Sequence, residues 1–188
     1  MNQTSRRGYQ PTGLKRKKKV QMANLIETLQ AEGTFTTFTR AIKMTEIVAA
    51  LREPGAYTMF APTDAAFAQM KADQVEDLFE DYEDMSKLVK YHIVMGIYRT
   101  TALLDMIFLK TMEGQRLTIA SSATNERDTE SLVDGSDAHG YVVRDTVTTT
   151  LLESIKVNGA HITRGNVSTD NGIIHVIDKV LVPRFMVI

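Results

Sequence analysis

The sequence contains no cysteine, and none of its apolar runs approaches the length needed to cross a membrane. The lack of cysteine excludes a disulfide framework, a thiolate zinc site and a cysteine nucleophile. The rest of the composition is typical of a folded chain, because 43% of the 188 residues are hydrophobic and 24% are charged. This length suits one domain with a sizeable core, plus a tail.

Acidic residues are missing from the first 19 positions, which hold seven lysines and arginines and so carry a charge of +7. The remaining chain has 15 basic residues against 23 acidic ones, a charge of −8. We therefore predict a basic, disordered arm at residues 1–21 and a single acidic domain at 22–188. Such an arm solubilises the chain or binds nucleic acid or another anionic surface, although its only aromatic residue is Tyr9.

Helical spacing of apolar residues dominates the sequence that follows the arm. Residues 22–33 predict a short helix ended by Gly33, and residues 34–51 predict a longer helix capped by Thr34. Further helices are expected at 65–70, 73–82 and 85–94. The acids within 73–81 fall on the outer face of their helix, which indicates a solvated surface and not a metal site.

From Thr111 onward the pattern becomes that of strands. A turn and a strand are expected within 112–120, a tight hairpin at Asn158-Gly159, and a long strand over 171–183 that Pro183 closes. Helices followed by strands, with no alternation between them and no internal repeat, predict an α+β domain.

A long polar segment at about 121–150 separates these strands and is expected to be an insertion in the domain. Connections of this length are usually functional or disordered. The segment has enough apolar residues to pack back on the domain, and we place a partner-binding surface around its tip, with a role-free insertion as the alternative. The candidate residues are Asp134, Asp137, His139, Tyr141 and Arg144.

The stretch YTMFAPTDAAF, from Tyr57 to Phe67, begins as a buried strand and turns directly into a helix. Pro62 stops the strand, and Thr63 and Asp64 are residue types that cap a helix. Taken alone, such a junction can be a catalytic elbow, an anion site or a structural corner.

This stretch and four later ones, LVKYHIVMGIY, EGQRLTI, IKVNGAHI and NGIIHVIDKVLVP, together resemble a fasciclin-like domain over residues 24–183. The resemblance implies a wedge-shaped β-sandwich flanked by several α-helices. It also implies a non-catalytic adhesion or protein-interaction module without a cofactor. The structural signature residues are Phe60, Pro62, Thr63, Asp64, Phe67, Asn158, Gly159, Gly172, His175 and Asp178.

The resemblance makes the Tyr57–Phe67 junction a structural corner and makes Tyr91 and His92 candidates for partner binding. Of this pair we expect Tyr91 to be exposed and His92 to be buried with a hydrogen-bonded ring. The implied partner is a protein or a cell-surface or matrix component, and the implied location is extracellular, although the chain shows no signal peptide. The animal integrin-binding motif is not reproduced in the segment Leu104–Ile107, so integrin binding is not inferred.

Enzyme chemistry is not indicated, because the sequence has no nucleophile elbow, zinc-protease, phosphate-loop or dinucleotide motif. A metal site is not expected either, since His175 and Asp178 lie three apart on a predicted strand and point to opposite faces. We expect a monomer. Two alternatives stay open, namely a carrier of an apolar carotenoid-like or lipid-like ligand and a binder of anionic surfaces through the arm.

Overall fold

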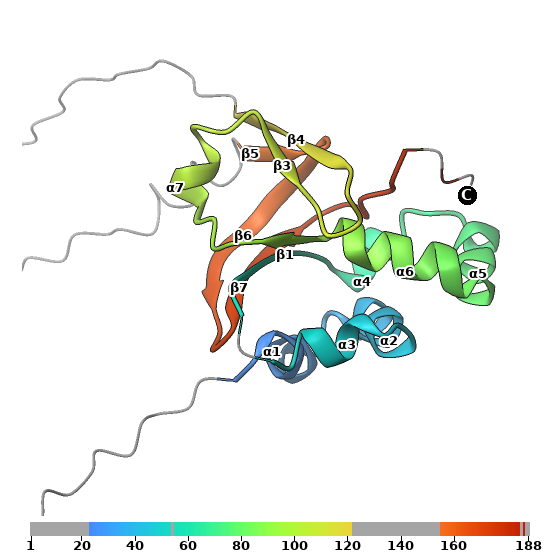
Figure 1. Ribbon diagram of the computed structural model, residues 1–188. Coiled ribbons are helices and arrows are strands. Elements are labelled where there is room, and N and C mark those ends of the chain that lie inside the picture. Colours follow the sequence, from blue (N-terminus) through green and yellow to red (C-terminus); the bar gives the residue numbers. More distant parts are fainter. Residues whose placement is uncertain (1–22, 54, 122–154, 185, 187–188) are drawn as a thin grey trace, which may run out of the picture.

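The computed structural model describes residues 23–53, 55–121, 155–184 and 186 (Figure 1). The predicted arm at 1–21 and all but the first residue of the polar segment 121–150 lie outside these residues. The same holds for five of the predicted partner-binding residues, which therefore stay predictions: Asp134, Asp137, His139, Tyr141 and Arg144.

Seven described strands form one mixed sheet with the order β2-β1-β7-β6-β5-β4-β3. Strand β1 pairs in parallel with β7 and antiparallel with β2. A bridge between Val94 and Thr111, with a 2.8 Å hydrogen bond from Met112 N to Ile93 O, brings the two ends of the sheet together into a nearly closed wedge. The strands are β1 Tyr57–Pro62, β2 Ile93–Met95, β3 Phe108–Lys110, β4 Arg116–Ser121, β5 Ile155–Val157, β6 Ala160–Ser168 and β7 Gly172–Ile177.

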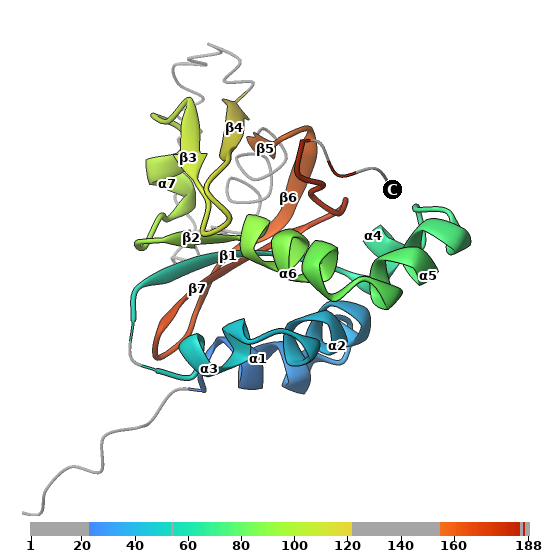
Figure 2. The same cartoon turned by 45° about the vertical axis from the view of Figure 1, so that its right-hand side comes forward.

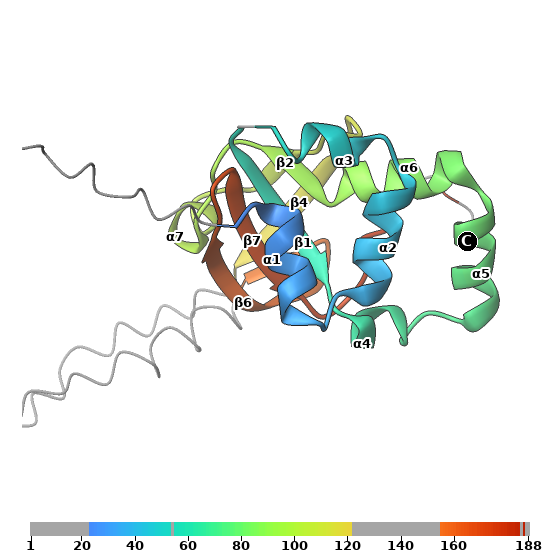
Figure 3. The ribbon, with the colours of Figure 1, turned by 90° about the horizontal axis from the view of Figure 1, so that it is seen from below.

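Helices cover the side of β1 and β7 that faces away from the interior of the wedge, and Figure 3, seen from below, shows α1 in front of these two strands with α2 beside it. The helices of the described residues are α1 Leu25–Glu32, α2 Thr36–Met44, α3 Ile47–Ala50, α4 Asp64–Phe67, α5 Ala72–Glu80, α6 Tyr82–Tyr91 and α7 Thr100–Leu103. This arrangement confirms the predicted α+β class and the expected wedge flanked by helices.

Strand β1 is buried on both faces and separates two hydrophobic cores. Met59 and Ala61 point into a core shared with the helices, where Phe67 also lies. Phe60 points into a second core inside the wedge and packs with Ile162 and Ile177. Because both faces of β1 are covered, its alternating side chains are distributed between the two cores, and only Tyr57 at its start is partly exposed.

Two signature glycines occupy backbone positions that a side chain would disturb. A Cβ atom on Gly172 would lie 2.5 Å from the carbonyl oxygen of Tyr57, so glycine permits the close approach of β7 to β1. Asn158 and Gly159 have φ values of 48° and 83°, which confirms the predicted tight hairpin between β5 and β6.

Two predicted helices are wrong in extent. The helix expected over 34–51 is broken into α2 and α3, because Thr45 adopts an extended conformation and its Oγ1 donates 2.8 Å to Ile42 O. The helix expected at 85–94 begins at Tyr82 and ends at Tyr91, after which the chain enters β2.

The long strand expected over 171–183 ends at Ile177. At this point Asp178 bonds the backbone of His161 in β6 twice. Its backbone N donates to His161 O at 3.1 Å, and its Oδ1 accepts from His161 N at 2.7 Å. The chain beyond Asp178 is thereby released from the sheet and runs toward the end of α6 (Figure 1).

The strand-to-helix junction joins three elements through two caps. Thr63 Oγ1 accepts from Ala66 N at 3.2 Å, within its own helix α4. The Asp64 carboxylate caps α2 instead, accepting from Thr36 N at 3.1 Å, Thr36 Oγ1 at 2.7 Å and Thr37 N at 2.8 Å. The expected Thr34 cap is therefore replaced by a residue from another element. Burial raises the pKa of Asp64, but these hydrogen bonds outweigh it and hold the pKa below its usual value.

Replacing Asp64 with alanine is expected to lower the free energy of unfolding by about 1–2 kcal/mol, because the first amides of α2 lose their acceptor. Glu76→Ala, on the exposed side of α5, is the matched control and should change stability by less than about 0.5 kcal/mol. Denaturant titration monitored by circular dichroism measures both. Equal stability of the two variants would show that Asp64 does not cap α2.

Candidate functional site

The predicted contact residue Tyr91 is only 1% exposed, so the expectation that it faces solvent is wrong. Its hydroxyl donates to Arg116 O at 3.3 Å and accepts from Asn158 Nδ2 at 2.6 Å. Burial raises the pKa of the Tyr91 phenol, and the Asn158 hydrogen bond opposes this only in part. Tyr91 therefore fastens the end of α6 to β4 and to the β5–β6 hairpin and offers no surface to a partner.

His92 is fully buried, as expected, and both ring nitrogens have backbone partners. Leu181 N donates to Nε2 at 3.0 Å, so Nδ1 carries the proton and donates to Leu88 O at 2.8 Å. The backbone oxygen of His92 also accepts from Phe60 N at 2.9 Å, and the ring lies 5.2 Å from that of Phe38. Burial lowers the pKa of His92 to about 4 against the partial opposition of the Leu88 hydrogen bond, so the ring is neutral at pH 7.

His175 is a second buried and occupied imidazole. Its Nε2 lies 2.7 Å from Tyr98 O, and Asn166 N approaches Nδ1 at 3.4 Å, so the proton is on Nε2. The ring stacks on Phe60 with centroids 5.6 Å apart, and burial lowers the pKa of His175. Within the described residues, no three histidine or acidic side chains gather as they would around a metal ion.

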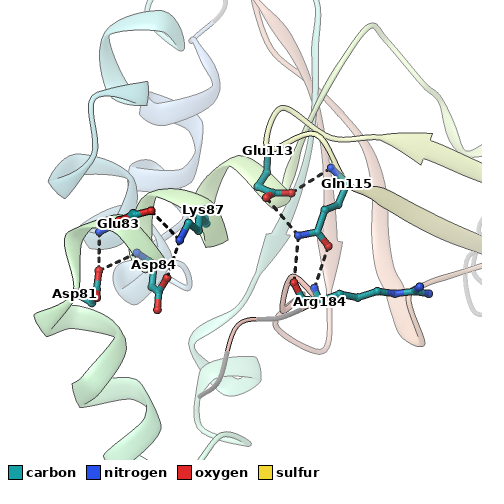
Figure 4. Close-up of polar contacts among 7 residues, drawn as sticks. All are labelled: Asp81, Glu83, Asp84, Lys87, Glu113, Gln115 and Arg184. Carbon is teal, nitrogen blue, oxygen red and sulfur yellow. Dashed lines mark hydrogen bonds and ion pairs between the residues drawn. The ribbon is translucent and has the colours of Figure 1, made fainter.

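Two polar clusters near α6 are structural (Figure 4). The Gln115 side chain holds the C-terminal segment, since Arg184 N donates to its Oε1 at 3.0 Å and its Nε2 donates to Arg184 O at 3.3 Å. Lys87 pairs with Glu83 at 2.9 Å and Asp84 at 3.3 Å within one turn of α6. These exposed pairs contribute little to stability.

Four exposed large apolar side chains lie on or beside β2 and β3, which meet at a single bridge between Val94 and Thr111. We call this surface the β2–β3 patch, and its four members are 67%, 46%, 77% and 49% exposed: Met95, Ile97, Ile107 and Phe108. Figure 2 shows β2, α7 and β3 together at one end of the molecule. Sequence reasoning missed this patch, although apolar residues beside the Gly96 turn were its signal.

Buried polar side chains fix the backbone under Met95 and Ile97. Thr58 Oγ1 donates to Gly96 O at 2.7 Å and accepts from Tyr98 N at 2.8 Å. His175 holds the Tyr98 carbonyl from the interior. The turn that carries Met95 and Ile97 is thus tied to β1 and β7, and the apolar side chains are presented from an ordered backbone.

The other half of the patch is fastened to β4 and β6. Ile119 N donates to Ile107 O at 2.8 Å, just before β3 begins. Asn166, at a left-handed position in β6 with φ of 59°, caps α7. Its Oδ1 accepts from Thr100 N at 3.0 Å, and its Nδ2 donates to Thr100 Oγ1 at 2.6 Å. The backbone on both sides of the β2–β3 patch is therefore held by hydrogen bonds, and the four apolar side chains are exposed from fixed positions.

The free energy of unfolding is expected to fall as the pH drops from about 6.5 toward 4. In this window the unfolded chain protonates His92 and His175, whose native pKa values burial lowers, while the native state does not. The loss attributable to His92 between pH 7 and pH 5 is on the order of 2 kcal/mol.

Urea titrations across this pH range measure the effect. His92→Gln should be less stable at pH 7 by about 1–3 kcal/mol and should show a flatter pH dependence. Ile162→Val, which removes a buried methyl group and no titrating group, should keep the parent slope. A parent protein whose stability is unchanged from pH 7 to pH 5 would rule out a neutral buried His92.

A family model and two sequence relatives match most of this chain. The fasciclin domain model matches residues 33–183. Protein sll1483 of Synechocystis sp. is 31% identical over 161 residues, which cover 85% of this chain and 73% of that protein. The uncharacterized protein sll1735 of Synechocystis sp. is 26% identical over 160 residues, covering 85% of this chain and 98% of that protein.

The fold matches the structure of a FAS1 domain pair from the insect cell adhesion molecule Fasciclin I. The TM-score is 0.62 and the sequence identity 19%, over 87% of this chain and 52% of that chain. The match of the domain model, which covers most of the sequence, and the shared fold lead to one conclusion. The chain belongs to the fasciclin domain family.

Proposed function

We propose that this protein is a non-catalytic interaction module that binds a protein partner through the β2–β3 patch. The observation that carries the proposal is the exposure of Met95, Ile97, Ile107 and Phe108 on an ordered backbone. Large exposed apolar surfaces that are rimmed by polar residues typically mark protein–protein contacts.

The surroundings of the patch favour a partner with an acidic rim. The Arg116 guanidinium lies 4.3 Å from the centre of the Phe108 ring, so it covers one edge of the apolar surface with positive charge. Arginine and aromatic side chains together are enriched at interface hot spots. The contact then combines apolar burial at the centre with a charge-assisted contact at the rim.

The two buried imidazoles of the described structure are occupied by backbone groups. Both ring nitrogens of His92 and of His175 are bound to backbone groups in the interior, and neither ring reaches solvent. A general base has to reach its substrate and accept a proton, and these two imidazoles do neither. This supports a binding role over catalysis.

The partner we propose is a component of a cell surface or extracellular matrix. The support is the shared fold with Fasciclin I, which is a cell adhesion molecule. Among the described helices, none has the length and hydropathy of a membrane span. We also propose that the arm at 1–21 and the segment around Asp134–Tyr141 contribute to binding this partner. The protein is proposed to be a monomer.

Site-specific photo-crosslinking tests the proposed surface. A photoreactive residue at Ile107 should give a discrete adduct with a protein from the cell-surface fraction of the native source, and Phe108→Ser should suppress it. The control position is Tyr82 on α6, which is 50% exposed and distant from the patch. Adducts that form equally at Tyr82, or that survive Phe108→Ser at parent yield, would refute the β2–β3 patch as the contact.

A further inference from the structure

A second surface feature, on the helical layer, is independent of the β2–β3 patch. A groove of about 570 Å³ runs along α1 and α2, on the far side of the sheet from α7 and β3 (Figures 1 and 2). Its floor is formed by the buried Leu29 and Phe35, and Met44, 39% exposed, lines its far end. The volume lies within the range of small-molecule sites.

The charge in this groove is opposite to that of the domain around it. Arg40 and Lys43 line it, whereas no acidic residue does. Outside the groove, the chain after residue 19 has 23 acidic residues against 13 basic ones. Neither Arg40 nor Lys43 belongs to an ion pair among the described residues, and the Arg40 guanidinium rests 4.5 Å from the centre of the Phe79 ring. Both cations are therefore available to an anionic group.

Thr39, on the floor of the groove, carries an unexplained polar atom. Its Oγ1 is buried and, within the described structure, has no hydrogen-bond partner, although Thr39 lines the groove through other atoms. An unpaired buried hydroxyl is unfavourable, and rotation about the Cα–Cβ bond exchanges the places of Oγ1 and the methyl group. A ligand with a polar head would give this hydroxyl a partner that the ligand-free fold lacks.

We propose that the groove along α1 and α2 binds a free medium-chain fatty acid. The alkyl chain lies over Leu29 and Phe35, and the carboxylate lies between Arg40 and Lys43. The groove follows α2 from Phe35 to Met44, and the nine residues of this helix span about 14 Å, a length suited to such a chain. A neutral apolar ligand would make no use of the two cations. This site goes beyond the proposed adhesion role and does not depend on it.

Calorimetric titration with dodecanoate, below its aggregation concentration, tests the site on the full chain. We expect saturable one-to-one binding to the parent and about tenfold weaker binding to Arg40→Gln/Lys43→Gln. The control Lys110→Gln/Lys156→Gln removes two exposed charges from the sheet and should bind like the parent. Absence of binding to the parent, or equal weakening in both double variants, overturns the proposal.

Two further measurements test the ligand's carboxylate and distinguish a free fatty acid from a membrane lipid. Dodecanol should bind the parent more weakly than dodecanoate and be indifferent to Arg40→Gln/Lys43→Gln; equal affinity for the two compounds would contradict a carboxylate site. Retention on phosphatidylglycerol vesicles that is lost in that variant, without binding of free dodecanoate, would identify a membrane contact and refute the fatty-acid proposal.

Thr39→Val distinguishes a ligand-linked hydroxyl from a merely buried one. The ligand-free variant should melt higher than the parent, because the unpaired Oγ1 is gone, while its affinity for dodecanoate falls. A variant that binds dodecanoate as tightly as the parent would exclude Thr39 from the site. Because the melting temperature is measured separately, a folding defect cannot be mistaken for loss of binding.

Discussion

The neutral, buried imidazole of His92 joins parts of the chain that are far apart in sequence. Its ring receives a hydrogen bond from Leu181 and donates one to Leu88, while its backbone oxygen pairs with Phe60. The C-terminal segment, α6 and β1 meet at this one residue. A protonated ring would lose the acceptor for Leu181 and carry an uncompensated charge in a dry interior, so the fold depends on this imidazole staying neutral.

Hydrogen bonds in the interior occupy the buried polar side chains, so the binding role that we propose rests on surface residues. Both faces of β1 are covered by hydrophobic cores, so water cannot reach the backbone groups near this strand. Buried side chains form hydrogen bonds with these backbone groups instead. Tyr91, His92 and His175 serve this purpose and are thereby removed from contact with any ligand. The exposed apolar residues of β2 and β3 are held in place by the same interior hydrogen bonds.

Features with local causes could be predicted from sequence. The Asn158-Gly159 hairpin follows from two left-handed backbone positions, and the burial of His92 follows from its apolar stripe on α6. Features with distant causes could not. Asp64 caps a helix 28 residues earlier in the chain, and Tyr91 is buried because Asn158 lies 67 residues further on. The β2–β3 patch likewise exists only once the sheet closes, since β2 and β3 are each three residues long and carry weak strand signals.

The protonation and tautomer of His92 test the central claim most directly. Nitrogen-15 NMR of the imidazole rings at pH 7 should show His92 as the neutral tautomer protonated at Nδ1, with a coupling across the hydrogen bond from Leu181 N–H to Nε2. A charged ring, or a proton on Nε2, would mean that Leu181 donates elsewhere. The account of how α6, β1 and the C-terminal segment are joined would then be incorrect.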